Sequence, residues 1–163
     1  MGEYVMTTVT IGGTVPHDVI ETGLVEAVAE HFRTLEDFSD LGELIEEALL
    51  EGTSVTFQGE CNCGKTDSLD AYCRRHGLSY QRAWTSALGQ FEAGLEYWRP
   101  GMNQPAEEAA DEGGEPVITL RELRAFQRKR GTTLAKLVAR MSRASALAVP
   151  PLTIAPSTGS DLA

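Results

Sequence analysis

The stretch that decides the fold class is YVMTTVTIGG, residues 4–13. In an extended chain Val5, Val9 and Ile11 share one face, and Met6, Thr8 and Thr10 share the other. A Gly-Gly pair closes the stretch and is typical of a turn. The pattern predicts a β-strand with one buried face at the start of the chain.

Two stretches with helical periodicity follow this strand. Apolar residues recur every three or four positions over residues 16–35, and the stretch begins with Pro16, which suits the first turn of a helix. The second helix is predicted to begin at Asp40, where Glu43 three residues later completes a capping-box pattern, and to end at Gly52. Both helices therefore have an apolar face to place on a sheet.

The segments after these helices complete an α+β domain. Strands are predicted over residues 53–58, 78–84 and 91–98, and a helix over 66–76. The order of elements is β-α-α-β-α-β-β. With right-handed crossovers this order gives a two-layer sandwich, a four-stranded mixed sheet with helices on one face, ferredoxin-like in style although not in the usual order of such domains.

Charge is distributed unevenly along the 163 residues. Residues 1–116 hold 22 of the 24 acidic and 6 of the 14 basic side chains, a net charge of −16, whereas residues 117–163 carry +6. Such a body attracts basic surfaces and repels phosphates, and the C-terminal part does the reverse. The predicted segments are an acidic α+β domain (1–103), a flexible acidic linker (104–116), a basic two-helix arm (117–149) and a disordered tail (150–163).

Targeting signals and cysteine usage indicate the compartment. The first ten residues lack the basic residues and apolar run of a secretory signal, and no apolar stretch approaches the roughly 20 residues that cross a bilayer. Three cysteines crowded into one region do not suit a secreted disulfide framework. We therefore expect a soluble cytoplasmic protein without a membrane partner.

One predicted turn matches a phosphate-binding motif. Residues 59–66, GECNCGKT, fit the P-loop consensus, in which Gly59 and Gly64 let backbone amides wrap phosphates, Lys65 reaches the terminal phosphates and Thr66 holds magnesium. The segment lies between a predicted strand and a predicted helix, as the motif requires. The alternative interpretation is an ordinary turn in which Thr66 or Asp67 caps the next helix.

The same turn supplies two of four side chains that zinc prefers. Cys61 and Cys63 lie in the turn, while Cys73 and His76 are three residues apart on one face of the predicted helix. Together they would close a structural zinc site, and no other cofactor is expected. In the alternative interpretation Cys73 is a small core residue beside Leu69.

Part of the chain resembles proteins of mobile genetic elements. The motifs YCRRHGLSY (residues 72–80) and YWRPGM (residues 97–102), within residues 55–102, resemble small uncharacterised proteins encoded on bacterial phages and plasmids. Small acidic proteins of such elements include anti-CRISPR and anti-restriction inhibitors. The resemblance implies an inhibitory role of this kind.

The basic arm has its own pattern. Capping signals at Thr119 with Glu122, and at Thr132 or Thr133, on either side of Gly131 predict a helical hairpin. The hairpin resembles the first two helices of a helix-turn-helix domain, but a Pro-Pro pair stands where the recognition helix should mature. One hypothesis is a DNA- or RNA-binding regulator, and another is docking of the arm on the acidic body. The residues of the nucleic-acid hypothesis are Arg121, Arg124, Arg128, Lys129, Arg130, Lys136, Arg140 and Arg143.

An acidic series gives the main functional hypothesis. Its members lie on and before the second predicted helix: Glu36, Asp37, Asp40, Glu43, Glu46, Glu47 and Glu51. Carboxylates repeated along a helix imitate a nucleic-acid backbone and suit the basic groove of a nucleic-acid-binding host complex. We therefore predict a non-catalytic protein-interaction module that acts as an inhibitor or decoy.

Overall fold

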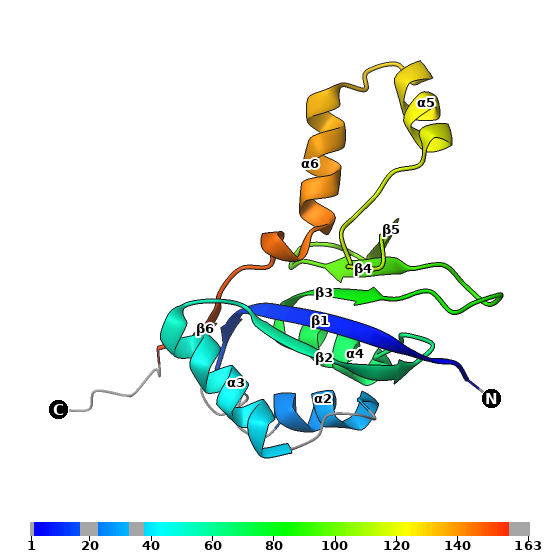
Figure 1. Ribbon diagram of the computed structural model, residues 1–163. Coiled ribbons are helices and arrows are strands. Elements are labelled where there is room, and N and C mark those ends of the chain that lie inside the picture. Colours follow the sequence, from blue (N-terminus) through cyan, green and yellow to red (C-terminus); the bar gives the residue numbers. More distant parts are fainter. Residues whose placement is uncertain (1, 17–22, 33–37, 157–163) are drawn as a thin grey trace.

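The structure is a computed structural model in which residues 2–16, 23–32 and 38–156 are described, with the backbone alone for residues 38–40. It is an α+β fold in which helices pack on one sheet and a helical hairpin stands away from it (Figure 1). None of the helices in these described ranges is both long enough and apolar enough to cross a membrane.

One sheet with six strands organises the described part of the chain. The strands are β1 (Tyr4–Val15), β2 (Val55–Asn62), β3 (Ser79–Trp84), β4 (Gly94–Trp98), β5 (Ala106–Ala109) and β6 (Leu152–Ile154). Their spatial order is β2-β1-β3-β4-β5, and β6 pairs in parallel with the end of β1. All other pairings between these strands are antiparallel.

β1 lies inside the sheet because its apolar face is long. Val5, Val9 and Ile11 are buried, as the alternation predicts. Val9 is level with Phe57 of β2 on one side and with Arg82 of β3 on the other. A strand with partners on both sides leaves its backbone donors and acceptors satisfied within the sheet.

Helices cover one face of this sheet. The helices in the described ranges are α2 (Val25–His31), α3 (Phe38–Glu51), α4 (Asp67–His76), α5 (Leu120–Arg128), α6 (Leu134–Ala144) and the short 3₁₀-helix η2 (Ala146–Ala148). Helices α2, α3 and α4 share one buried apolar cluster with β1, β2 and β3. α4 ends as predicted at Gly77, whose φ of 68° is the left-handed conformation that glycine adopts without strain.

The predicted sheet is wrong in its number of strands and in its ferredoxin-like style. The first seven elements follow the predicted order, and α2, α3 and α4 do pack on one face. However, β1 lies between β2 and β3 and is antiparallel to both. β5 and β6 bring the sheet from four strands to six.

The predicted linker and tail both contribute strands. Residues 104–116 contain β5, after which Asp111 accepts hydrogen bonds from the amides of Gly113 and Glu115. They are therefore not a flexible linker. In the predicted tail, residues 152–154 form β6 beside β1, and residues 157–163 lie outside the described ranges.

Gly12 lets the tail approach β1. A Cβ atom at this position would lie 1.6 Å from the carbonyl oxygen of Pro150. The next amide, that of Gly13, donates to the carbonyl of Pro151 at 3.1 Å. A residue without a side chain is required where two backbones pack this closely.

Helix starts differ from prediction in the acidic domain. α3 begins at Phe38, so Asp40 lies within the first turn and the predicted capping box with Glu43 is wrong. Thr66 precedes α4, but its hydroxyl donates to Asp70 at 2.7 Å and makes no cap. Asp40 fails as a cap because it lies inside the helix, and Thr66 fails because its hydroxyl bonds Asp70 instead of a backbone amide.

The capping signals of the arm are confirmed. Thr119 and Glu122 form the reciprocal capping box at the start of α5. Thr133 accepts a hydrogen bond from the amide of Lys136 at the start of α6. α5 and α6 therefore form a helical hairpin within the predicted range 117–149, and η2 follows α6.

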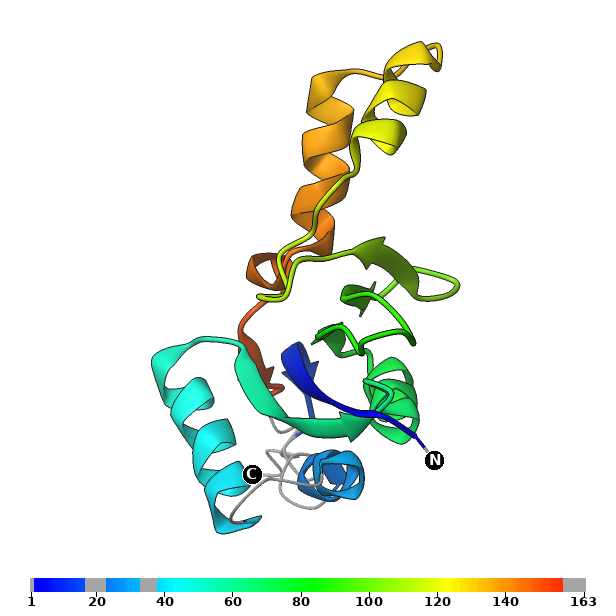
Figure 2. The same ribbon diagram turned by 45° about the vertical axis from the view of Figure 1, so that its right-hand side comes forward.

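Polar contacts anchor the hairpin at its root. Arg140 donates two hydrogen bonds to Glu108 of β5, at 2.6 and 2.7 Å. Arg99, just beyond β4, donates to the carbonyl of Arg143 at 2.9 Å, and Ala144 is fully buried. From this root the two helices extend away from the sheet (Figures 1 and 2).

Candidate interaction surfaces

The P-loop segment forms a tight turn whose amides are already bonded. Gly59 lies in β2, level with Thr7 of β1. The amides of Cys63, Gly64 and Lys65 donate to the carbonyls of Glu3, Cys61 and Asn62 at 2.6, 3.3 and 3.1 Å. Thr66 is fully buried. The predicted phosphate cradle is therefore not formed, because its backbone donors point to carbonyl groups of the protein.

The four predicted zinc ligands do not meet. Cys61 and Cys73 are buried in the core, Cys63 donates to Asn62 of the turn, and His76 packs against the ring of Tyr72. No three His, Cys, Asp or Glu side chains come together to hold a metal ion in the described residues. The ligand set predicted from spacing is wrong, and the alternative, Cys73 as a core residue, is correct.

Burial also suppresses the reactivity of two of these thiols. Loss of hydration raises the pKa of Cys61 to about 11, although a hydrogen bond with Thr7 opposes the shift. Loss of hydration likewise raises the pKa of Cys73, far above the usual range. Because the thiolate is the nucleophile, neither residue is poised for nucleophilic attack near neutral pH.

A buried ion network lies between α4 and the sheet, and sequence analysis did not predict it. Arg82 of β3 contacts Asp70 of α4 and Glu96 of β4, each at 3.1 Å, and donates to the carbonyl of Gly64 at 2.6 Å. Tyr80 donates to Glu96 at 2.8 Å. The network joins a helix, two strands and the turn before the helix.

The electrostatics of this network follow from its burial. Loss of hydration raises the pKa of Asp70, and the attraction of Arg82 opposes this shift. For Arg82, burial favours the neutral form, but Asp70 and Glu96 outweigh burial and raise the pKa. The side chains of Arg82 and Asp70 are only 6% and 5% exposed, so the network supports the fold and offers no surface to a partner.

The acidic face of α3 is exposed where it is described. We use this name for Glu43, Glu46, Glu47, Leu50 and Glu51. Successive members three or four residues apart share one side of the helix. Of the other predicted contact residues, Glu36 and Asp37 lie outside the described residues, as does the side chain of Asp40.

An exposed leucine lies within the acidic face. Leu50 is 88% exposed and follows Glu46 by four residues and Glu47 by three, so its side chain lies among the carboxylates. Leu41 and Ile45 on the opposite side of the helix are buried in the core. The face therefore combines negative charge with apolar surface that the fold does not use.

The basic residues of the arm divide into two groups. Arg140 is held by Glu108 at the root and is not available to a partner. The other seven are exposed: Arg121, Arg124, Arg128, Lys129, Arg130, Lys136 and Arg143. Among the described residues, no salt bridge joins any of these seven to a carboxylate. Their positive charge is therefore open to solvent.

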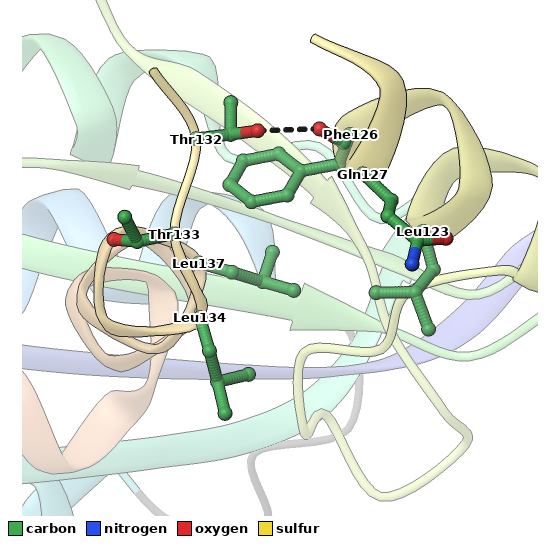
Figure 3. A pocket seen from close by; sticks show the side chains of 7 residues that line it. All are labelled: Leu123, Phe126, Gln127, Thr132, Thr133, Leu134 and Leu137. Atoms are coloured by element: carbon green, nitrogen blue, oxygen red, sulfur yellow. Dashed lines mark hydrogen bonds between the residues drawn. The ribbon is translucent and has the colours of Figure 1, made fainter. Parts of the chain in front are cut away.

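The two helices of the arm also leave an apolar groove between them. The groove has a volume of about 340 Å³, and Figure 3 shows leucine and phenylalanine side chains of both helices turned toward it. Its lining residues are Leu123, Phe126, Gln127, Thr132, Thr133, Leu134 and Leu137. Thr132 donates to the carbonyl of Phe126 at 2.6 Å and fixes the turn between the helices. We call this surface the arm groove.

The arm does not cover the acidic face of its own chain. In both views the hairpin extends from the β4–β5 side of the sheet, and α3 lies at the other end of the molecule (Figures 1 and 2). The salt bridge between arm and body, Arg140 with Glu108, is at the root. The predicted alternative, docking of the arm on the acidic body, is therefore limited to contacts at this root, and the acidic face of α3 stays uncovered.

Comparison of the chain with protein-family models, curated proteins and solved structures gave no match.

Proposed function

We propose that the protein is a non-catalytic interaction module that captures a basic protein surface through the acidic face of α3. The observation that carries the proposal is that the basic arm extends away from this face and leaves its carboxylates exposed. Repulsion from the rest of an acidic body disfavours acidic partners, and long-range attraction speeds encounter with basic ones.

The composition of the face suits a protein partner. Apolar surface at the centre of a polar rim is typical of protein interfaces, and Leu50 lies among carboxylates in this way. The row formed by Glu43, Glu47 and Glu51 places a carboxylate about every 6 Å along the helix axis. Such a row supports the narrower proposal of a decoy that occupies a nucleic-acid-binding groove of a host complex.

Charge reversal on α3 tests the proposal. Changing Glu43, Glu46, Glu47 and Glu51 to lysine should weaken binding to bacterial proteins captured by the wild type at least about tenfold, because attraction becomes repulsion. Affinity capture from a bacterial lysate with quantitative mass spectrometry measures the loss. If duplex DNA displaces the captured proteins, the decoy form is supported.

The control is a second variant that has the same net charge as the α3 variant. Its four reversed residues are exposed carboxylates outside α3: Glu3, Glu92, Glu107 and Glu115. The control should retain capture, and circular dichroism should show both variants folded. Equal loss in the two variants would mean that overall charge, and not the α3 face, attracts the captured proteins. No loss in either would end the proposal.

The seven exposed basic side chains of the arm support a second candidate, a nucleic-acid-binding regulator. The full-length protein should then retard a DNA duplex in gels, and retardation should fall steeply between about 50 and 200 mM salt because phosphate contacts release counterions. Reversal of Arg124 and Arg128 to glutamate should reduce the salt slope. A duplex that migrates freely at 50 mM salt would remove this candidate.

A further inference from the structure

We infer that the arm groove is a docking site for α3 of a second copy of this chain. The inference uses the acidic face of the proposed function and names a partner for it. It begins from apolar surface that the fold leaves uncovered on the arm. Leu134 is 75% exposed and Leu123 is exposed as well, and both line the groove. Contiguous exposed apolar surface of this kind marks a binding site.

The chemistry of the arm groove selects its occupant. Leucine and phenylalanine line the groove, and the hairpin that forms it carries seven exposed arginine and lysine side chains. A groove between two helices accepts a third helix that presents apolar anchors. The exposed basic residues favour an occupant whose flanks are acidic. The expected ligand is therefore an amphipathic acidic helix, and not a nucleic acid, which offers no comparable apolar anchor.

Helix α3 of this chain has these properties. Leu50 is an exposed apolar anchor, and Leu44 is exposed at the margin of the same face. Glu43, Glu46 and Glu47 flank Leu50. The helix offers leucine and glutamate, the arm groove offers leucine and phenylalanine, and the hairpin around the groove is basic, so the two surfaces are complementary in both apolar content and charge.

The geometry requires two molecules for this contact. The hairpin that forms the arm groove and α3 lie at opposite ends of the folded molecule in both views (Figures 1 and 2). The pairing of Arg140 with Glu108 holds the root of the arm. Two different surfaces meet in such a contact, so it is heterologous, and it leaves a free groove on one molecule and a free α3 on the next. The expected assembly is head-to-tail.

Light scattering coupled to size-exclusion chromatography tests the inference on the purified full-length protein. At low salt the mass should rise with concentration above the 17.6 kDa of one chain, and about 0.5 M salt should reduce it because salt screens the charges. Leu134→Asp, a groove position, should weaken association at least about tenfold. Leu147→Asp, an exposed position on η2 outside the groove, is the matched control. A wild type that stays at the mass of one chain would overturn the inference.

Mixing complementary charge variants provides the decisive result. One variant, with Glu43, Glu46, Glu47 and Glu51 changed to lysine, should not self-associate. A second variant, with Arg124, Arg128, Lys129 and Arg130 changed to glutamate, should not self-associate either. The two variants mixed should associate, because the lysine-bearing α3 then meets an acidic arm. If the mixture stays monomeric, the pairing is wrong. A monomeric wild type whose capture of other proteins is still lost on α3 reversal would overturn this inference alone and leave the proposed function standing.

Discussion

Replacing Arg82 by alanine should lower the free energy of unfolding by about 3 to 5 kcal/mol. The guanidinium lies 3.1 Å from a carboxylate oxygen of Asp70 and 3.1 Å from one of Glu96. Without it, a buried carboxylate of Asp70 has no positive partner and must take up a proton or admit water, and both cost stability. Urea unfolding followed by circular dichroism measures the change.

Two further variants distinguish the network from a general effect of losing an arginine. Arg75→Ala removes an exposed arginine from α4 and should change stability by less than about 0.5 kcal/mol. The double variant Arg82→Ala with Asp70→Asn should be less destabilised than the sum of its parts, because the second change removes the uncompensated charge. An Arg82→Ala variant as stable as Arg75→Ala would show that the network does not support the fold.

The network shows where prediction from this sequence stops. The strand over residues 78–84 is predicted almost to its observed bounds, but Arg82 faces Glu96 only because β3 pairs with β4 in one register. Asp70 reaches Arg82 from α4, which packs on the sheet. One signal was available: Arg82 shares a strand face with Tyr80, and an arginine on a buried face requires a carboxylate partner.

The short strands were missed for a different reason. β5 has the sequence AEEA and β6 only three residues, and neither is long enough to show an alternation of period two. The prediction then rests on composition alone. An acidic, alanine-rich stretch is typical of a linker, and a stretch that follows two prolines is typical of a tail. β5 forms because the edge of β4 accepts a partner, with Leu95 level with Glu108. A single sequence does not contain that pairing.

Charge asymmetry could be predicted, but its arrangement in space could not. Counting side chains separates an acidic body from a basic arm. Whether the arm lies on the body depends on where the hairpin is anchored, and the anchor is Arg140 on Glu108. Glu108 belongs to the segment predicted as a flexible linker. Because that segment is a strand, it holds the arm away from α3, and the two surfaces of opposite charge stay separate on one molecule.

Replacing Leu152 by alanine should lower the free energy of unfolding by about 2 to 5 kcal/mol, although only eleven residues follow it in the sequence. Leu152 is 1% exposed and belongs to the main apolar cluster. Its amide donates to the carbonyl of Thr53 at 2.9 Å, so the backbone around it is held and collapse onto the new cavity is restricted. The melting temperature should fall by roughly 2 to 4 °C for each kcal/mol lost.

Leu147→Ala is the matched control for this substitution. Leu147 is 92% exposed on η2, five residues earlier, and its truncation should change stability by less than about 0.5 kcal/mol. Thermal unfolding of the two variants side by side therefore compares the same chemical change inside and outside the core. If both melt like the wild type, β6 does not close the sheet beside β1. A large loss for Leu152→Ala alone would place the C-terminal strand in the cooperative core, where it joins the arm to the sheet at a second point beyond the pairing of Arg140 with Glu108.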